Sequence, residues 1–262
     1  MSEVLGVPVH SDLVSTWRDW FAPLVQPFPI HRLRPDVAAD IPGHHVEPTA
    51  EWIDTFFMYA GHWTWLDEPA FLGLAPVHRR SLLAARRRST RPKKVISVWP
   101  TELDAAGDQL MFDWISSSVR PSRHRSVGPR VWDRAAQLLP GGRRLAGTFA
   151  GSGSGANCFG TVMAAAGEPV EDQQVSPEPF RDWLDSHTEP VEGTRHDAEP
   201  GVVFVWTEHG ELAHATVTVG AGWMLTKPSQ SWSSPRMIWT VREAVNSWRY
   251  PETRLSRHRL RR

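Results

Sequence analysis

The single cysteine of the chain stands where thiol chemistry would be expected. Cys158 follows the Gly/Ser-rich segment 147–155 and begins an apolar, alanine-rich segment that predicts a helix. A thiol is a nucleophile only as its thiolate, and the N–H groups at a helix N-terminus lower its pKa. Gly153, Gly155 and Gly160 would let a substrate backbone approach closely. The alternative is that Cys158 is a small apolar core residue.

His214 is the residue best suited to activate that thiol. It lies in the alternating segment Leu212–Val219, which predicts a strand. A histidine on a central strand loses hydration unless it has a polar partner, and a neighbouring thiol would be one. We therefore expect His214 to be the base for Cys158. The alternative is a hydrogen-bonded core histidine with no catalytic role.

A Cys/His pair needs a third polar group that fixes the tautomer of the imidazole. The segment Trp223–Lys227 predicts a strand antiparallel to that of His214. Thr226 is the residue on it that is expected to face His214. Ser229 and Gln230, in the loop that follows, are the alternatives.

Two segments resemble a known family. The string Phe149 to Val162 (FAGSGSGANCFGTV) is similar to the nucleophile motif of the NlpC-type papain-like cysteine hydrolases and acyltransferases. The string His214 to Thr226 (HATVTVGAGWMLT) resembles that family's histidine strand, turn and third-residue strand. The resemblance covers residues 145–250. It implies a papain-like α+β fold, with a helix that bears Cys158 packed on an antiparallel sheet that bears His214, and acyl-thioester chemistry on amides or esters.

The chain also departs from the motif of that family. Asn157 replaces the acid before the cysteine, Phe159 replaces the serine after it, Phe149 replaces a tyrosine, and Thr226 stands at the third catalytic position. Without the tyrosine hydroxyl, oxyanion stabilisation falls to the backbone N–H of Cys158 and to a side chain such as Ser154. Asn157 and Phe149 remain candidates for oxyanion or substrate contact.

The elements around the motif predict an α+β C-terminal domain over residues 141–262. A helix is expected from Ser176 to about Ser186, because Ser176 and Pro177 form a strong helix start. After Gly201, short turns separate Val/Thr/Trp-rich runs that predict an antiparallel meander. Its expected strands are 202–207, 212–219, 223–226, 237–241 and 247–250.

Residues 1–140 predict a mainly helical, Trp-rich N-terminal region. Helices are expected at 12–25, 49–60, 101–116 and 127–139, and the arginine-rich stretch may be read as a further one. Residues 26–48 are rich in Pro and His and predict a loop, and residues 95–99 a short strand. The chain has fourteen Trp, which by default are core residues and can also line ligand pockets.

Charge is unevenly distributed although the formal net charge is zero. Residues 78–94 contain eight Lys or Arg and no acid, and the segment 254–262 contains five Arg. Arg86, Arg87 and Arg88 would then contact a polyanion, such as a tRNA or a carrier-borne acyl donor. The alternative is a solvated helix face whose arginine stems cover apolar groups.

Composition excludes several classes of protein. One cysteine excludes an intramolecular disulfide framework and favours a reducing compartment. No secretory signal and no membrane span are recognisable, so we expect a cytoplasmic protein with no membrane partner. His44, His45 and Glu47 lack the spacing of a preformed metal site, and no phosphate-binding loop is present. Neither a metal nor a cofactor is expected.

These observations favour an enzyme that forms an acyl-Cys158 intermediate on a small molecule or peptide. The acceptor would be water in an amidase or peptidase, and an amine in a transferase. One alternative is a transferase whose RNA- or carrier-borne donor is held by residues 78–94. Another is a catalytically inactive papain-like binding module.

Overall fold

A computed structural model describes residues 2–89, 98–117, 119–151 and 153–261. The chain forms two compact units, and each is described by itself. The N-terminal unit comprises residues 1–4 and 9–120, and the C-terminal unit comprises residues 5–8 and 121–262. The division therefore lies at residue 120 and not at the expected residue 140. The reason is helix α8 (Pro129–Ala135), whose Trp132 and Ala135 belong to the core of the C-terminal unit.

The N-terminal unit is mainly helical, as expected. Its helices are α1 (Ser11–Phe21), α2 (Pro35–Ala39), α3 (Ala50–Phe56), α4 (Glu68–Gly73), α5 (Pro76–Ser89), α6 (Pro100–Ala106) and α7 (Gln109–Ser116). Strands β3 (Val25–Pro29) and β4 (Trp63–Asp67) pair antiparallel. Thr49 caps α3 through its side chain, as its sequence position indicates.

Local conformation explains two differences in this unit. The single helix expected over 101–116 is divided into α6 and α7, because Gly107 adopts a φ of 76° that ends α6. The loop expected over 26–48 begins with most of strand β3. Of the strand expected at 95–99, residues 95–97 lie outside the described residues, and Trp99 precedes α6 as its N-cap residue.

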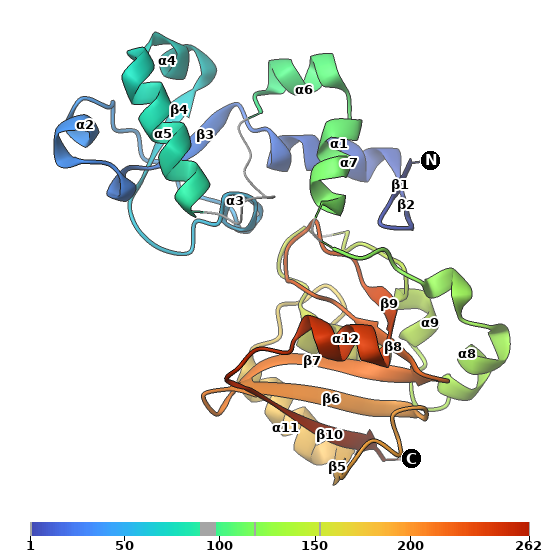
Figure 1. Cartoon of the computed structure of the whole chain (residues 1–262). Helices are drawn as coiled ribbons and strands as arrows, with labels where there is room; N and C mark the ends of the chain where they lie inside the picture. Colours follow the sequence, from blue (N-terminus) through green and yellow to red (C-terminus); the bar gives the residue numbers. More distant parts are fainter. Residues whose placement is uncertain (1, 90–97, 118, 152, 262) are drawn as a thin grey trace. The chain divides into compact units, whose positions relative to one another are not determined.

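The C-terminal unit is an α+β structure built on an antiparallel sheet of six strands (Figure 1). Their order is β5 (Thr188–Val191), β10 (Thr253–Leu260), β6 (Pro200–Glu208), β7 (Glu211–Gly220), β8 (Trp223–Thr226) and β9 (Met237–Thr240). Helices α9 (Gly142–Leu145), α10 (Cys158–Ala165) and α11 (Pro177–His187) pack with α8 on one face. Helix α12 (Val241–Ser247) lies on the other face, and Figure 1 shows the sheet between α11 and α12.

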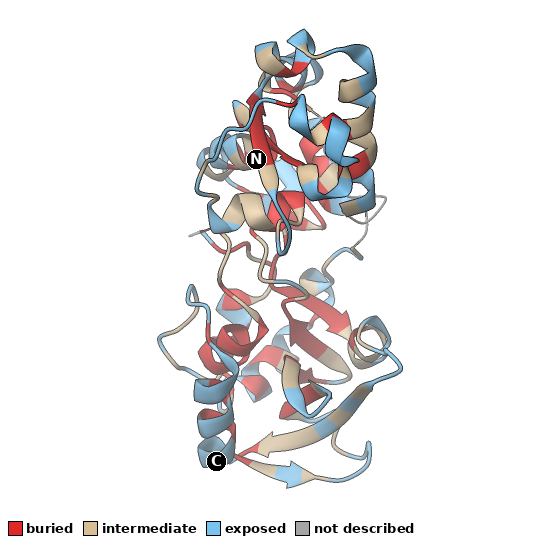
Figure 2. Cartoon of the chain, turned by 90° about the vertical axis from the view of Figure 1, so that its left-hand side faces the viewer, coloured by how far each residue is buried: buried red, intermediate tan, exposed pale blue. Residues whose placement is uncertain are grey.

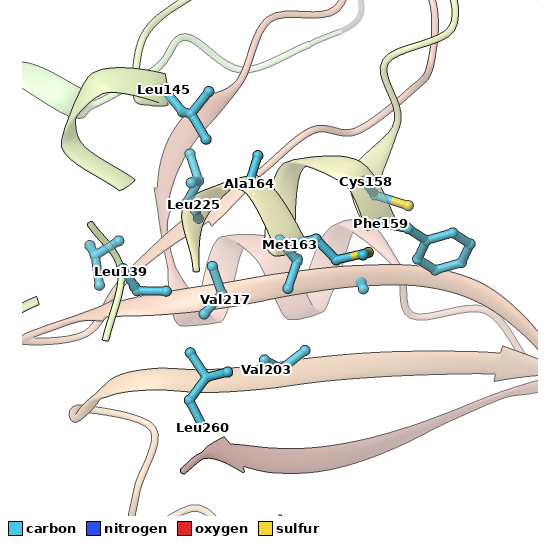
Figure 3. Close-up of a cluster of buried hydrophobic side chains, with 14 of the residues drawn as sticks. Leu139, Leu145, Cys158, Phe159, Met163, Ala164, Val203, Val217, Leu225 and Leu260 are labelled. Atoms are coloured by element: carbon cyan, nitrogen blue, oxygen red, sulfur yellow. The ribbon is translucent and has the colours of Figure 1, made fainter. Parts of the chain in front are cut away.

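The core of the C-terminal unit lies between α10 and the central strands. Every residue of α10 is buried, and it packs on inward-facing valines of β6 and β7 (Figure 3). Figure 2 shows that burial follows the central strands, whereas β10 is largely intermediate or exposed. The order of the central strands β6, β7, β8 and β9 is the expected meander.

Two parts of this sheet differ from expectation. The segment expected as a strand at 247–250 is the end of α12 and the loop after it, because Thr240 and Glu243 form a capping box that starts the helix. The arginine-rich segment 254–262, for which no strand was expected, mostly forms β10. There Arg257 and Arg259 pair with Asp197 and Glu189.

Candidate functional site

Cys158 is the first residue of α10, as the sequence predicts. Asn157 is the N-cap residue, and its Oδ1 accepts a hydrogen bond from the N–H of Gly160 at 3.0 Å. Its Nδ2 donates to the carbonyl of Val175 at 2.6 Å. Both ends of the Asn157 amide therefore hold α10 in place, so we remove this residue from the expected oxyanion and substrate contacts. The Cys158 residue is 9 % exposed and lies at the edge of the core (Figure 3).

The glycine-rich loop before Cys158 is fixed by the loop that follows β8. The N–H of Gly155 donates to the carbonyl of Gln230 at 3.1 Å, and the N–H of Trp232 donates to Ser154 Oγ at 3.1 Å. Two of the predicted site residues, Ser154 and Gln230, therefore lie where these loops meet. Phe149, the third residue expected near the oxyanion, is buried.

The sulfur of Cys158 lies beside the backbone of β7. Burial raises the pKa of the Cys158 thiol to about 11. The N–H groups of Ala215, Phe159 and Cys158 itself act in the opposite direction and lower it, as does the charge of Lys227. Because Ala215 directly follows His214, the sulfur and the histidine backbone are neighbours. Adjacent Cα atoms in a chain are about 3.8 Å apart.

The imidazole of His214 nevertheless lies on the other face of the sheet. Side chains alternate along a strand, and Ala215, Val217 and Val219 belong to the same core cluster as Cys158. His214 is directly opposite Trp206 on β6 and stacks on Trp248, with ring centroids 4.1 Å apart and an interplanar angle of 8°.

The expected thiolate–imidazolium pair is therefore absent from this structure. His214 Nε2 is buried and makes no hydrogen bond, and burial lowers the pKa of His214 to about 3. With a thiol pKa of about 11, both side chains are uncharged at neutral pH. The prediction that the two residues come together holds at the level of the backbone. The expected contact between the imidazole and the thiol is not formed in this arrangement, because the imidazole is held between aromatic rings.

No third residue is bonded to the imidazole Nε2. Thr226 is buried at the end of β8, on the face of Met224 by alternation. The sulfur of Met224 accepts a hydrogen bond from the hydroxyl of Thr216, which by alternation lies on the same face of β7 as His214. Thr226 and His214 therefore lie on the same face of the sheet. Gln230 Oε1 instead accepts from Gln174 Nε2 at 3.4 Å.

Lys227 is a residue at this site that the sequence analysis missed. It is 1 % exposed, and its Nζ donates to the carbonyls of Ser229 at 2.8 Å, Ser231 at 3.3 Å and Ser234 at 2.8 Å. The ammonium therefore holds together the loop that in turn fixes Gly155 and Ser154. A signal was present: a lysine that directly follows an apolar strand and precedes a serine-rich loop.

Arg86 does not belong to a polyanion-binding surface. It is 2 % exposed, and its guanidinium donates to Gln26 Oε1 and to the carbonyl of Pro27. It also lies 3.8 Å from the ring centroid of Phe28, and burial lowers its pKa to about 9. Arg87 and Arg88 are exposed, and Arg88 donates to the carbonyl of Arg32. The predicted triplet is thus one core residue and two surface residues.

Searches for metal, membrane and family features add little. Across the described ranges, no three metal-ligating side chains lie close enough to hold an ion, and no helix is both long and apolar enough to cross a membrane. No family model, no curated protein and no solved structure matches the chain.

Proposed function

We propose that the chain is a cysteine-dependent acyl-transfer enzyme with an NlpC-type, papain-like C-terminal unit. Cys158 is its nucleophile and His214 its base. One observation carries the proposal: Cys158 begins a buried helix, and its sulfur lies beside the N–H of the residue that follows His214. The two sequence motifs that resemble the family lie on the elements that meet there.

The reaction follows from the groups at the site. The Cys158 thiol gives its proton to the imidazole, and the sulfur attacks the carbonyl carbon of an amide or ester. The N–H groups of Cys158 and Phe159 face the sulfur and would donate to the oxyanion that forms. The imidazolium then protonates the leaving amine or alcohol, and acyl-Cys158 remains. Water or an amine, deprotonated by His214, takes the acyl group and regenerates the thiol.

Activation requires a movement of the imidazole. In the resting arrangement His214 stacks on Trp248 and its Nε2 has no hydrogen-bond partner. Because side chains alternate along β7, the ring can reach the sulfur only if β7 shifts locally by one residue. We propose that substrate binding drives this shift at the irregularity in register between Trp206 and Thr207, next to His214, so that the two groups can exchange a proton. Shielding the pair until substrate arrives would limit side reactions of a free thiolate.

The test is direct detection of acyl-Cys158. The full chain is incubated with a panel of activated acyl esters at neutral pH, and intact mass is measured over time. We expect a mass increase of one acyl group that Cys158→Ala abolishes. His214→Ala should slow acylation by about 10² or more, as loss of a general base does. Cys158→Ala should change the free energy of unfolding by no more than about 1–2 kcal/mol, because it removes one sulfur atom. Equal labelling of the wild type and Cys158→Ala would end the proposal.

A second function, a catalytically inactive binding module, is favoured by the resting protonation states. A thiol pKa of about 11 and an imidazole pKa of about 3 are those of uncharged core residues. If it is correct, no ester of the panel acylates Cys158, and His214→Ala leaves the rate of thiol alkylation unchanged.

A further inference from the structure

A pocket of the C-terminal unit lies next to the stacked histidine. It has a volume of about 600 Å³ and opens between β6, β10 and the segment that follows α12. Pockets of this size hold small organic molecules. Its aromatic lining consists of Trp206, Trp248 and Tyr250.

The floor of this pocket is formed by Leu255 and Trp206, on two neighbouring strands, and His214 lies beside it on a third. Leu255 on β10 is directly opposite Trp206 on β6, and Trp206 is directly opposite His214 on β7. Trp248 stacks on His214 and forms one wall of the pocket. Tyr250 stands edge-on to Trp248, with centroids 5.9 Å apart, and is 51 % exposed. A flat ligand could therefore stack against exposed aromatic surface, one ring away from His214.

The charge of the lining selects for an anion. Arg249 lines the pocket and is exposed, and no acidic side chain is among the residues that line it. Over the part of the chain that the structure describes, Arg249 forms no ion pair. Arg257, on the same face of the sheet, is neutralised by Asp197 at 2.7 Å. The guanidinium of Arg249 is thus the cation available to a ligand in this pocket.

We infer that this pocket binds a planar aromatic carboxylate, with the ring packed against the aromatic side chains of Trp206, Trp248 and Tyr250 and the carboxylate on Arg249. The inference goes beyond the proposed function, because the pocket opens on the face of β6 and β7 that is opposite to Cys158.

The experiment uses the full chain carrying Cys158→Ala, so that binding is measured without turnover. Calorimetric titrations at low salt compare 2-naphthoate with 2-naphthamide, which lacks the charge, and with hexanoate, which lacks the ring. We expect 2-naphthoate to bind most tightly of the three. Arg249→Gln should weaken it by about fivefold, the effect of an exposed ion pair. Tyr250→Ala should weaken it by about threefold or more through loss of ring contact.

Arg254→Gln is the matched control. Arg254 is an exposed cation next to Leu255 on β10, and alternation directs it away from the pocket. It should leave the affinity unchanged. Failure of 2-naphthoate to bind, equal affinity for the amide, or equal weakening by Arg254→Gln would overturn the inference. If Cys158 is acylated but 2-naphthoate does not bind, only the proposed ligand of the pocket is wrong. If 2-naphthoate binds but Cys158 is not acylated, only the proposed acyl-transfer function is wrong.

Discussion

The buried imidazole of His214 has a free-energy penalty that contacts with the surrounding aromatic rings must offset. A buried polar atom with no hydrogen bond destabilises a fold by about 1–3 kcal/mol. His214 Nε2 is such an atom, while its ring stacks on Trp248 and lies 5.5 Å from the ring of Trp206. Stacked aromatic pairs contribute about 0.5–1.5 kcal/mol each. The imidazole is thus tolerated in its neutral form.

The pKa of His214 makes the stability of the C-terminal unit depend on pH. The folded pKa of about 3 lies below the ordinary value of about 6.5, so between these values only the unfolded chain binds the proton. Its contribution is present above pH 6.5 and is lost as pH falls toward 3. Between pH 7 and pH 4 we expect the wild type to lose about 3 kcal/mol more than His214→Phe, which keeps the stacked ring. Urea denaturation at the two pH values measures the difference.

An exposed histidine provides the control for this experiment. His209 has a side chain 74 % exposed at a turn, where its φ of 51° also suits asparagine. His209→Asn should therefore keep the pH dependence of the wild type. If His214→Phe keeps it as well, protonation of His214 is not its cause.

At the scale of elements, the helix starts and the meander from β6 to β9 could be predicted, and strands β5 and β10 could not. Asn157 before Cys158 and Pro177 after Ser176 are local signals, and both helices begin there. Strand β10 reads as a charged tail, because its arginines find partners in Asp197 and Glu189, which are distant in sequence. Such pairing appears only when the sheet is assembled.

The face of the sheet to which His214 points could be predicted from the alternation of its strand, whereas the expected pairing with Cys158 placed it on the wrong face. Ala215, Val217 and Val219 are apolar and alternate with His214, Thr216 and Thr218. That pattern directs the first set to the helix and the second set away from it. The proximity of Cys158 to this strand was predicted correctly through the motif, whereas the direction of the imidazole follows from the alternation.

Lys227 connects the elements of the site, and its removal should affect two of them. Lys227→Met removes the donor to the carbonyls of Ser229, Ser231 and Ser234, of which only Ser234 is a buried residue, and should destabilise the C-terminal unit by about 1–3 kcal/mol. It also removes a positive charge that lowers the pKa of Cys158, so alkylation of the thiol at pH 8 should become slower. Denaturation and iodoacetamide kinetics measure the two effects.

Ser231→Ala is the control that distinguishes loss of the Lys227 ammonium from a change elsewhere in its loop. Lys227 bonds the carbonyl of Ser231 and not its hydroxyl, so this variant keeps the contact. We expect little change in stability or alkylation. Faster alkylation in Lys227→Met would contradict the electrostatic role, because a merely loosened loop exposes the thiol without raising its pKa.

At the scale of the whole molecule, the described residues include a hydrophobic core cluster in each unit. The core of the N-terminal unit contains Phe28, Leu82 and Trp99, and that of the C-terminal unit surrounds α10. Arg86 lies in the first unit and bonds the backbone and side chain of residues 26–27. The arginine-rich stretch therefore serves the fold of the N-terminal unit in part, which its composition alone does not indicate.

Variants of Arg86 and Lys227 test whether the two units unfold separately. Arg86→Met removes the donor from Gln26 and Pro27 and should cost about 2–4 kcal/mol, as loss of a buried hydrogen-bonded charge does. In a unit of this size that corresponds to a fall of about 10 °C in its transition temperature. Scanning calorimetry should resolve two transitions, of which Arg86→Met lowers one and Lys227→Met the other. Arg87→Gln, at the exposed neighbouring position, should lower neither. If each variant lowers both transitions together, the two cores are energetically coupled and the chain folds as one cooperative structure.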